Sequence, residues 1–112
     1  MKSTALLRDT AKIAITTYPN VALVFFMICA FRDNDPESYY YLGRIYYYGL
    51  GVEKDYCQAF NYLTKAVENG HVEACNLYSD CYYHGNGVEQ DIGKYILWLY
   101  EYFSRRKKYD FV

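Results

Sequence analysis

Apolar positions along the chain follow a helical spacing. Ala59, Leu63 and Ala66 are three or four positions apart, so they share one face of a helix that covers 57–67. The run VALVFFMICAF, residues 21–31, is apolar throughout and is too short to span a bilayer, so it is interpreted as a buried helix. The pattern predicts an all-α protein.

Capping and turn residues divide this pattern into pairs of helices. Asp35 can cap a helix that starts at Pro36, because proline is favoured at the first helical position. Gly49 can end that helix in the left-handed conformation. Asp55 can cap the next helix, which Gly70 would end. The sequence therefore predicts a helical hairpin with a glycine-containing loop.

The loop of this hairpin occurs twice. GLGVEKD at residues 49–55 recurs as GNGVEQD at residues 85–91, an offset of 36 positions. The same offset places Tyr46 on Tyr82, so the flanking helix repeats with the loop. Helical hairpins that repeat at a fixed period bury their apolar faces by stacking, and this predicts an α-solenoid.

The first third of the chain is expected to be a divergent copy of the same unit. When the offset of 36 is applied towards the N-terminus, Ala30 aligns with Ala66. Ile13 and Ile15 then align with the two loop glycines, Gly49 and Gly51. The turn of this copy must therefore be built differently. The expected organisation is a single domain with a divergent first copy, two regular copies and a tail, over residues 1–36, 37–72, 73–108 and 109–112.

The residues of the two regular copies resemble the Sel-one-like repeat (SLR) family, a relative of the tetratricopeptide repeats. The second copy departs from the signature, with Tyr78 and Ser79 in place of Leu-Gly. The resemblance implies an α-solenoid of stacked hairpins that is used for protein–protein contacts. The matching positions in the middle copy are Leu42, Gly43, Tyr46, Gly49, Gly51, Val52, Asp55, Ala59, Lys65, Ala66 and Gly70.

Composition and charge exclude some classes of partner. The chain of 112 residues has 12 Lys and Arg against 13 Asp and Glu, a net charge of -1, so no global field attracts nucleic acid or an anionic membrane. Its 16 tyrosines suit both a core and a contact surface. No targeting segment is recognised, and a cytoplasmic location is expected.

The residues that could form a nucleotide-binding loop, a metal site or a catalytic centre do not have the arrangement that these sites need. Gly49 and Gly51 follow a tyrosine-rich helix instead of a strand and lack the third glycine of a nucleotide-binding loop. His71 and Cys75 lie on one side of a helix, but Cys81 and His84 point to the other, so they cannot share a metal ion. With two histidines and no nucleophile arrangement, the sequence predicts no enzyme activity, cofactor or metal.

Two alternatives remain open. A cysteine-rich branch of the family is secreted, disulfide-bonded and linked to β-lactam-related activity, but Val67 occupies one of its two cysteine positions and Cys75 the other. Cys29, Cys57, Cys75 and Cys81 are therefore expected to be reduced. The second alternative is a membrane-associated repeat protein anchored by residues 13–31.

The candidate binding surface follows from the resemblance, which implies that the first helix of each hairpin lines the concave side. Leu42, Gly43 and Tyr46 are then packing positions. Tyr and Arg side chains are common anchors in protein interfaces. The alternative is that Tyr47 and Tyr83 pack between helices. The candidate residues are Tyr40, Arg44, Tyr47 and Tyr48 in the middle copy, Asn76, Asp80, Tyr83 and His84 in the last, and Thr4, Arg8 and Lys12 in the first.

The expected function is that of a non-catalytic module that binds another protein through this surface, as an adaptor, inhibitor or immunity-type antagonist. A second contact is expected at the last helix, residues 92–103, which is rich in apolar side chains and predicts a homodimer or a complex with another chain. The basic residues 105–108 after it are interpreted as complementing the helix dipole.

Overall fold

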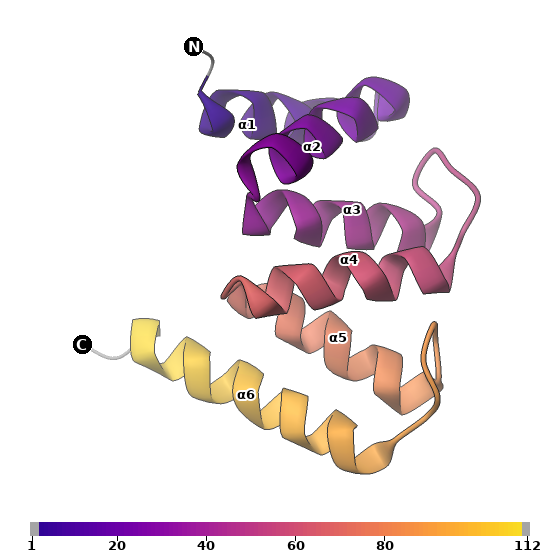
Figure 1. Ribbon diagram of the computed structural model, residues 1–112, viewed down its shortest axis with the longest axis vertical. Helices are drawn as coiled ribbons and strands as arrows, with labels where there is room; N and C mark the ends of the chain where they lie inside the picture. The colour runs from indigo at the N-terminus through magenta and orange to yellow at the C-terminus, as the bar shows by residue number, and fades with distance from the viewer. Residues whose placement is uncertain (1–2, 111–112) are drawn as a thin grey trace.

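The computed structural model describes residues 3–110, with side chains for residues 3–107. This part of the chain forms six helices and no strand, which confirms the all-α class. Figure 1 shows the helices as three hairpins stacked one on another, an α-solenoid. The helices are α1 (Thr4–Ala14), α2 (Pro19–Asp33), α3 (Pro36–Tyr48), α4 (Tyr56–Glu68), α5 (Val72–His84) and α6 (Ile92–Asp110).

The predicted caps begin and end the helices of the regular hairpins. Asp35 and Asp55 accept hydrogen bonds from the backbone N–H groups of Ser38 and Gln58, each at 3.1 Å. Asp91 does the same for Lys94 at 3.0 Å, which starts α6. Since α6 continues to Asp110, the expected tail 109–112 begins inside a helix, and residues 111 and 112 lie outside the described residues.

The core lies between the two helices of each hairpin and between neighbouring hairpins. Leu42, Ile45 and Leu63 are fully buried. A Cβ atom on Gly43 would lie 2.7 Å from Leu63 Cγ, so glycine allows α3 to approach α4 closely. Ser79 takes the equivalent position in α5 and, although buried, donates its hydroxyl to the Asn76 carbonyl at 2.6 Å.

The second glycine of each loop makes room for the preceding hairpin. A Cβ atom on Gly51 would overlap the ring of Pro19 at the start of α2. A Cβ atom on Gly87 would overlap the carbonyl oxygen of Tyr56 at the start of α4. The repeated glycine therefore serves the contact between hairpins as well as the turn.

The first hairpin departs from the predicted register. Its buried residues Ala22, Phe26 and Ala30 match Ala59, Leu63 and Val67 of α4 at an offset of 37, so the predicted alignment of Ala30 with Ala66 is wrong by one position. The connection between α2 and α3 is one residue shorter than that between α4 and α5, which accounts for the change.

The turn of the first hairpin is also shorter. It covers only residues 15–18, compared with residues 49–55 in the next hairpin, and Ile13 belongs to α1. This difference explains how the turn forms without the loop glycines. None of the helices in residues 3–110 is long and apolar enough to cross a membrane.

Candidate partner-binding surface

A groove of about 220 Å³ lies between the first helices of the second and third hairpins. Five of its seven lining residues are sequence-predicted candidates, and the other two were not singled out. Leu77 has an apolar side chain that is mostly buried, and Glu73 lies in the first turn of α5. The lining consists of Tyr40, Arg44 and Tyr48 from α3 and Glu73, Asn76, Leu77 and Asp80 from α5.

Aromatic rings hold the guanidinium of Arg44 in the groove. Its Cζ lies 5.7 Å from the centre of the Tyr40 ring and 5.6 Å from that of Tyr41. Within residues 3–107 no carboxylate forms an ion pair with it. The group is therefore positioned by cation–π contacts while its donors stay available.

Tyr40 is in turn supported by His71, whose ring stacks on it at 4.6 Å. His71 caps α5, because its Nδ1 accepts a hydrogen bond from the Ala74 N–H at 3.2 Å. Burial lowers the pKa of His71, which keeps the ring neutral and able to accept this bond. Burial also raises the pKa of Tyr40, against the lowering effect of Arg44.

Asp80 provides a negative group on the opposite wall. Burial raises the pKa of its carboxyl, and the nearby His84 offsets only part of this increase. Glu73, also on this wall, is in contact with α6: Tyr102 donates to it at 3.4 Å and Arg106 lies 3.8 Å away. Within residues 3–107, the Asp80 side chain forms no ion pair or hydrogen bond, so its carboxylate lines the groove unpaired.

Tyr47, Tyr83 and His84 lie outside the groove lining. The Tyr47 hydroxyl accepts a hydrogen bond from Asn86 Nδ2 at 2.9 Å, and its ring packs against Tyr56. Tyr83 packs against Tyr95 of α6, with ring centres 4.8 Å apart, and against the edge of His84. These contacts place the three side chains at the loop end of the hairpins.

The candidate residues of α1 are engaged within the chain. Arg8 forms ion pairs with Asp35 at 3.0 Å and with Glu37 at 3.1 Å, and Lys12 contacts Glu37 at 2.9 Å. The Thr4 hydroxyl donates to Asp33 at 2.6 Å. Arg8 and Lys12 thus hold the first hairpin against the start of α3, Thr4 joins α1 to the end of α2, and none of the three lines the groove.

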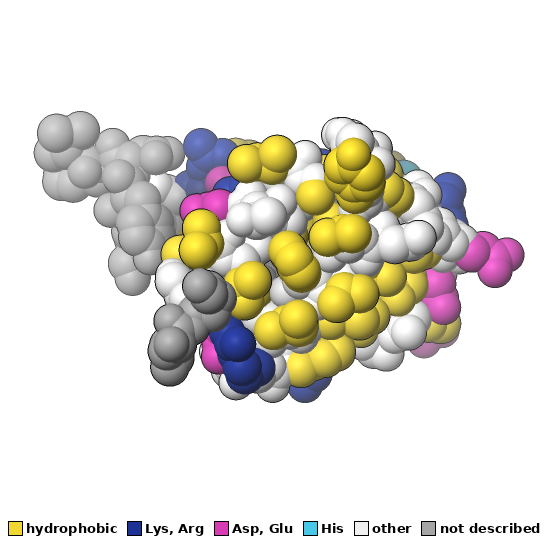
Figure 2. Space-filling model, turned by 90° about the horizontal axis from the view of Figure 1, so that it is seen from above, with side chains coloured by type: hydrophobic (Ala, Val, Ile, Leu, Met, Phe, Trp, Pro, Cys, Tyr) yellow, Lys and Arg dark blue, Asp and Glu magenta, His cyan; other side chains and the backbone are white. Residues whose placement is uncertain are grey.

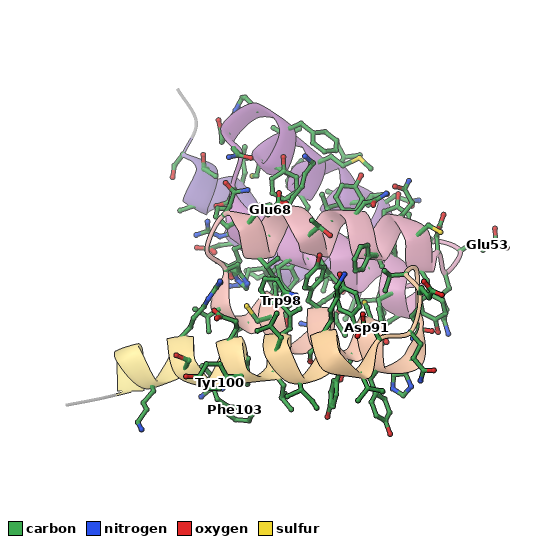
Figure 3. The ribbon with its side chains drawn as sticks, turned by 60° about the horizontal axis from the view of Figure 1, so that its bottom comes forward. Glu53, Glu68, Asp91, Trp98, Tyr100 and Phe103 are labelled. Atoms are coloured by element: carbon green, nitrogen blue, oxygen red, sulfur yellow. The ribbon has the colours of Figure 1, made fainter. Side chains whose placement is uncertain are left out.

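The two ends of the stack expose apolar side chains. Figure 2 looks onto the end formed by the first hairpin, where hydrophobic side chains gather over a wide area. Leu6, Ile13 and Val24 are among the exposed residues of this hairpin. At the other end, Tyr100 and Phe103 point away from α5, whereas Trp98 points back towards it (Figure 3).

The thiols and other ligand-type side chains form no chemical centre in the described part of the chain. No group of three or more His, Cys, Asp or Glu residues comes together there as a metal site. All four cysteines are free, and burial raises the pKa of Cys81 to about 12. Buried thiols of this kind are poor nucleophiles.

The stacked hairpins, with a groove between their first helices, define a helical-repeat scaffold. The family model described as Sel1 repeat matches residues 36–71 and 72–99, together more than half of the chain, and the chain belongs to this family. Sel1 repeat proteins generally mediate protein–protein interactions, and their fold is typically a non-catalytic scaffold. This identification confirms the resemblance found in the sequence.

Solved structures agree in fold. A Sel1 repeat protein from Oxalobacter formigenes superposes with a TM-score of 0.82 at 24% identity, covering 91% of this chain and 42% of that one. The protein c5321, a protective antigen of uropathogenic Escherichia coli strains with an SLR fold, gives 0.76 at 24% identity, covering 94% and 26%. The chain thus spans less than half of either protein. No curated protein matches the sequence significantly.

Proposed function

We propose that the chain is a non-catalytic module that binds another protein as an adaptor, inhibitor or immunity-type antagonist, through the side formed by α1, α3 and α5. The observation that carries the proposal is the groove between α3 and α5. Its tyrosines and Arg44, whose guanidinium contacts two aromatic rings, are of the residue types enriched in protein interfaces.

The proposal is tested by capture of a partner from the native organism. The two quantities measured for each variant are the strength of capture and the melting temperature. Arg44→Ala and Tyr48→Ala should each weaken capture by about 2 kcal/mol, roughly thirtyfold, because both side chains line the groove. Their melting temperatures should stay near that of the wild type, because both positions are at least partly exposed.

The matched control for this experiment is Leu63→Ala in the core. Leu63 is fully buried, so its truncation should lower the free energy of unfolding by about 3 kcal/mol. Below the new melting temperature this variant should capture the partner normally. If both groove variants bind as the wild type does while Tyr100→Ala abolishes capture, the binding surface is the end of the stack.

The proposal includes a second contact, a homodimer through residues 92–103. The supporting observation is the outer side of α6, where Ile96, Tyr100 and Phe103 are 59%, 67% and 61% exposed. At an offset of 36, they correspond to Phe60, Thr64 and Val67 of α4. Phe60 stacks on Tyr78 of α5 at 4.9 Å, and the Thr64 hydroxyl donates to the Tyr78 hydroxyl at 3.0 Å. The α6 positions are thus those that bind a further helix elsewhere in the stack.

A cytoplasmic location is also part of the proposal. The four free cysteines support it, because unpaired thiols persist in reducing compartments. The test is mass measurement before and after alkylation under denaturing conditions, on protein purified from its native source without reductant. Four alkylated thiols are expected, and a disulfide would contradict the location.

A further inference from the structure

The groove between α3 and α5 presents a positive and a negative group that do not neutralise each other, beside Glu73, which Tyr102 and Arg106 of α6 contact. Arg44 and Asp80 both line it, yet no ion pair joins them within the described residues. They occupy the same position of the repeat, 36 residues apart. The two hairpins therefore place opposite charges at matching points on the two walls.

The first hairpin shows what pairing within the chain looks like. The guanidinium of Arg8, on α1, is neutralised by Asp35 and Glu37. Arg44 instead has only the rings of Tyr40 and Tyr41, which orient it without compensating its charge. The unpaired state of Arg44 is thus a specific feature of the groove.

The charges also determine which ligands fit poorly. An all-acidic segment would meet Asp80 and Glu73, and an all-basic segment would meet Arg44. Like charges brought together in a partly buried site repel, so both kinds of ligand lose affinity. A segment that carries one charge of each sign can satisfy both walls.

The spacing of the walls limits the ligand further. Arg44 and Asp80 belong to different helices, α3 and α5, and both line the same groove of about 220 Å³. In an extended peptide, side chains two positions apart are on the same face and about 7 Å apart at their Cα atoms, and their flexible ends cover the remaining distance. Two opposite charges at positions i and i+2 therefore match the two walls.

We propose that this groove recognises an extended segment of a partner protein that carries an acidic and a basic side chain two positions apart, the carboxylate bound by Arg44 and the cation by Asp80. The inference rests on the proposed function, because it specifies the ligand of the same surface. Asn76 and the Tyr40 hydroxyl, which line the groove beside the charged groups, are available for the backbone of the segment.

The test measures fluorescence anisotropy of labelled nine-residue peptides with the full chain at low ionic strength. The peptides share a Gly/Ser frame and carry Glu-Ala-Lys, Lys-Ala-Glu, Glu-Ala-Glu, Lys-Ala-Lys or Gln-Ala-Gln at the centre. At least one mixed-charge peptide should bind about tenfold more tightly than the neutral and like-charged ones. Arg44→Gln and Asp80→Asn should each remove this preference.

Charge reversal gives a sharper outcome that does not depend on the direction of the peptide chain. Asp80→Arg should turn the preference towards Glu-Ala-Glu, and Arg44→Asp should turn it towards Lys-Ala-Lys. The controls Glu89→Arg and Lys65→Asp make the same charge changes at exposed positions outside the groove. They should leave the preference unchanged. Circular dichroism confirms that each variant is folded, and the neutral variants decide the matter if a reversal unfolds the chain.

The inference is wrong if neither mixed peptide binds better than the neutral one, or if the groove variants keep the wild-type preference. Either result leaves the proposed function to be judged separately. If Arg44→Ala and Tyr48→Ala still weaken capture of the partner, the groove binds a protein by other chemistry. If they do not, the binding surface itself is misplaced.

Discussion

At the scale of single residues, the two glycines of each loop have different roles. Gly49 and Gly85 end α3 and α5 in the left-handed conformation, with φ angles of 68° and 73°. Gly51 and Gly87 adopt positive φ angles too, but they also sit directly against the start of the preceding second helix. The loop is therefore conserved between the two copies for reasons of turn geometry and of stacking.

This distinction predicts different costs for two alanine substitutions. Gly70→Ala should lower the free energy of unfolding by about 1 kcal/mol, because its φ of +88° is strained for alanine but nothing lies within 4 Å of the added Cβ. Gly87→Ala should cost about 3 kcal/mol, because the added Cβ also meets the Tyr56 backbone. Denaturant unfolding measures both, and equal costs would show that the close approach is unimportant.

The cap residue His71 predicts a pH dependence of stability. Because the pKa of His71 is lowered in the folded chain, the unfolded chain binds this proton more tightly. The stability due to neutral His71 is therefore complete above its ordinary pKa of 6.5 and is lost as the pH falls from there towards the lowered value. Protonation also removes the acceptor for the Ala74 N–H.

The measurement is the free energy of unfolding between about pH 5 and pH 8 for the wild type and two variants. His71→Asn keeps a cap acceptor without a titrating ring, so its stability should vary less with pH in this range. His84→Asn, at an exposed position at the end of α5, should follow the wild type. A wild-type slope in His71→Asn would assign the pH dependence to other groups.

At the scale of the helices, the sequence predicted some elements better than others. α3 and α4 carry local signals, since Asp35, Pro36, Gly49 and Asp55 act within a few residues of where they stand. The buried face of α2 could not be predicted, because a run that is apolar on every side does not indicate which side is covered. Its one-residue change of register depends on the short connection to α3.

The first hairpin is predicted to be necessary for the stability of the others. Phe26 of α2 stacks on Tyr41 of α3 at 5.1 Å, and Leu42 beside it is fully buried. A chain that begins at Asp35 loses this cover together with the ion pairs of Arg8, so it should melt far below the full chain or aggregate.

Thermal unfolding followed by circular dichroism decides this prediction. A chain that begins at Ser3 is the control, because it keeps all the described residues, including the cap that Ser3 provides for Leu6. It should melt like the full chain. Cooperative melting of the shorter chain at the full-length temperature would show that the second and third hairpins fold independently.

At the scale of the whole molecule, the candidate surface was only partly predictable. The repeat offset gives the shared position of Arg44 and Asp80, and the resemblance to the family implied that this position lines the concave side. The pairing of Arg8 and Lys12 depends on how α1 lies against α3, which no local pattern specifies. Likewise, Tyr47 is bound by Asn86, a residue of the next loop, and only the stacking brings the two together.

The exposed side of α6 predicts self-association that depends on concentration. In light scattering, the measured mass should rise from monomer towards dimer as the protein concentration increases, because association covers Ile96, Tyr100 and Phe103. The double variant Tyr100→Ser and Phe103→Ser should stay monomeric. Tyr48→Ser removes an exposed ring at the groove and should associate normally. A monomeric wild type at high concentration would contradict the homodimer.

The order of the helix contacts has a mechanical consequence. The main backbone contacts join helices that follow one another in the chain, from α1 to α6. A force that pulls the two ends apart is therefore transmitted through these interfaces one after another, and the weakest interface separates first. A ligand held by Arg44 and Asp80 connects α3 directly to α5 and adds a second path for the load around α4. With the ligand bound, the middle of the solenoid is therefore stiffer than it is without the ligand.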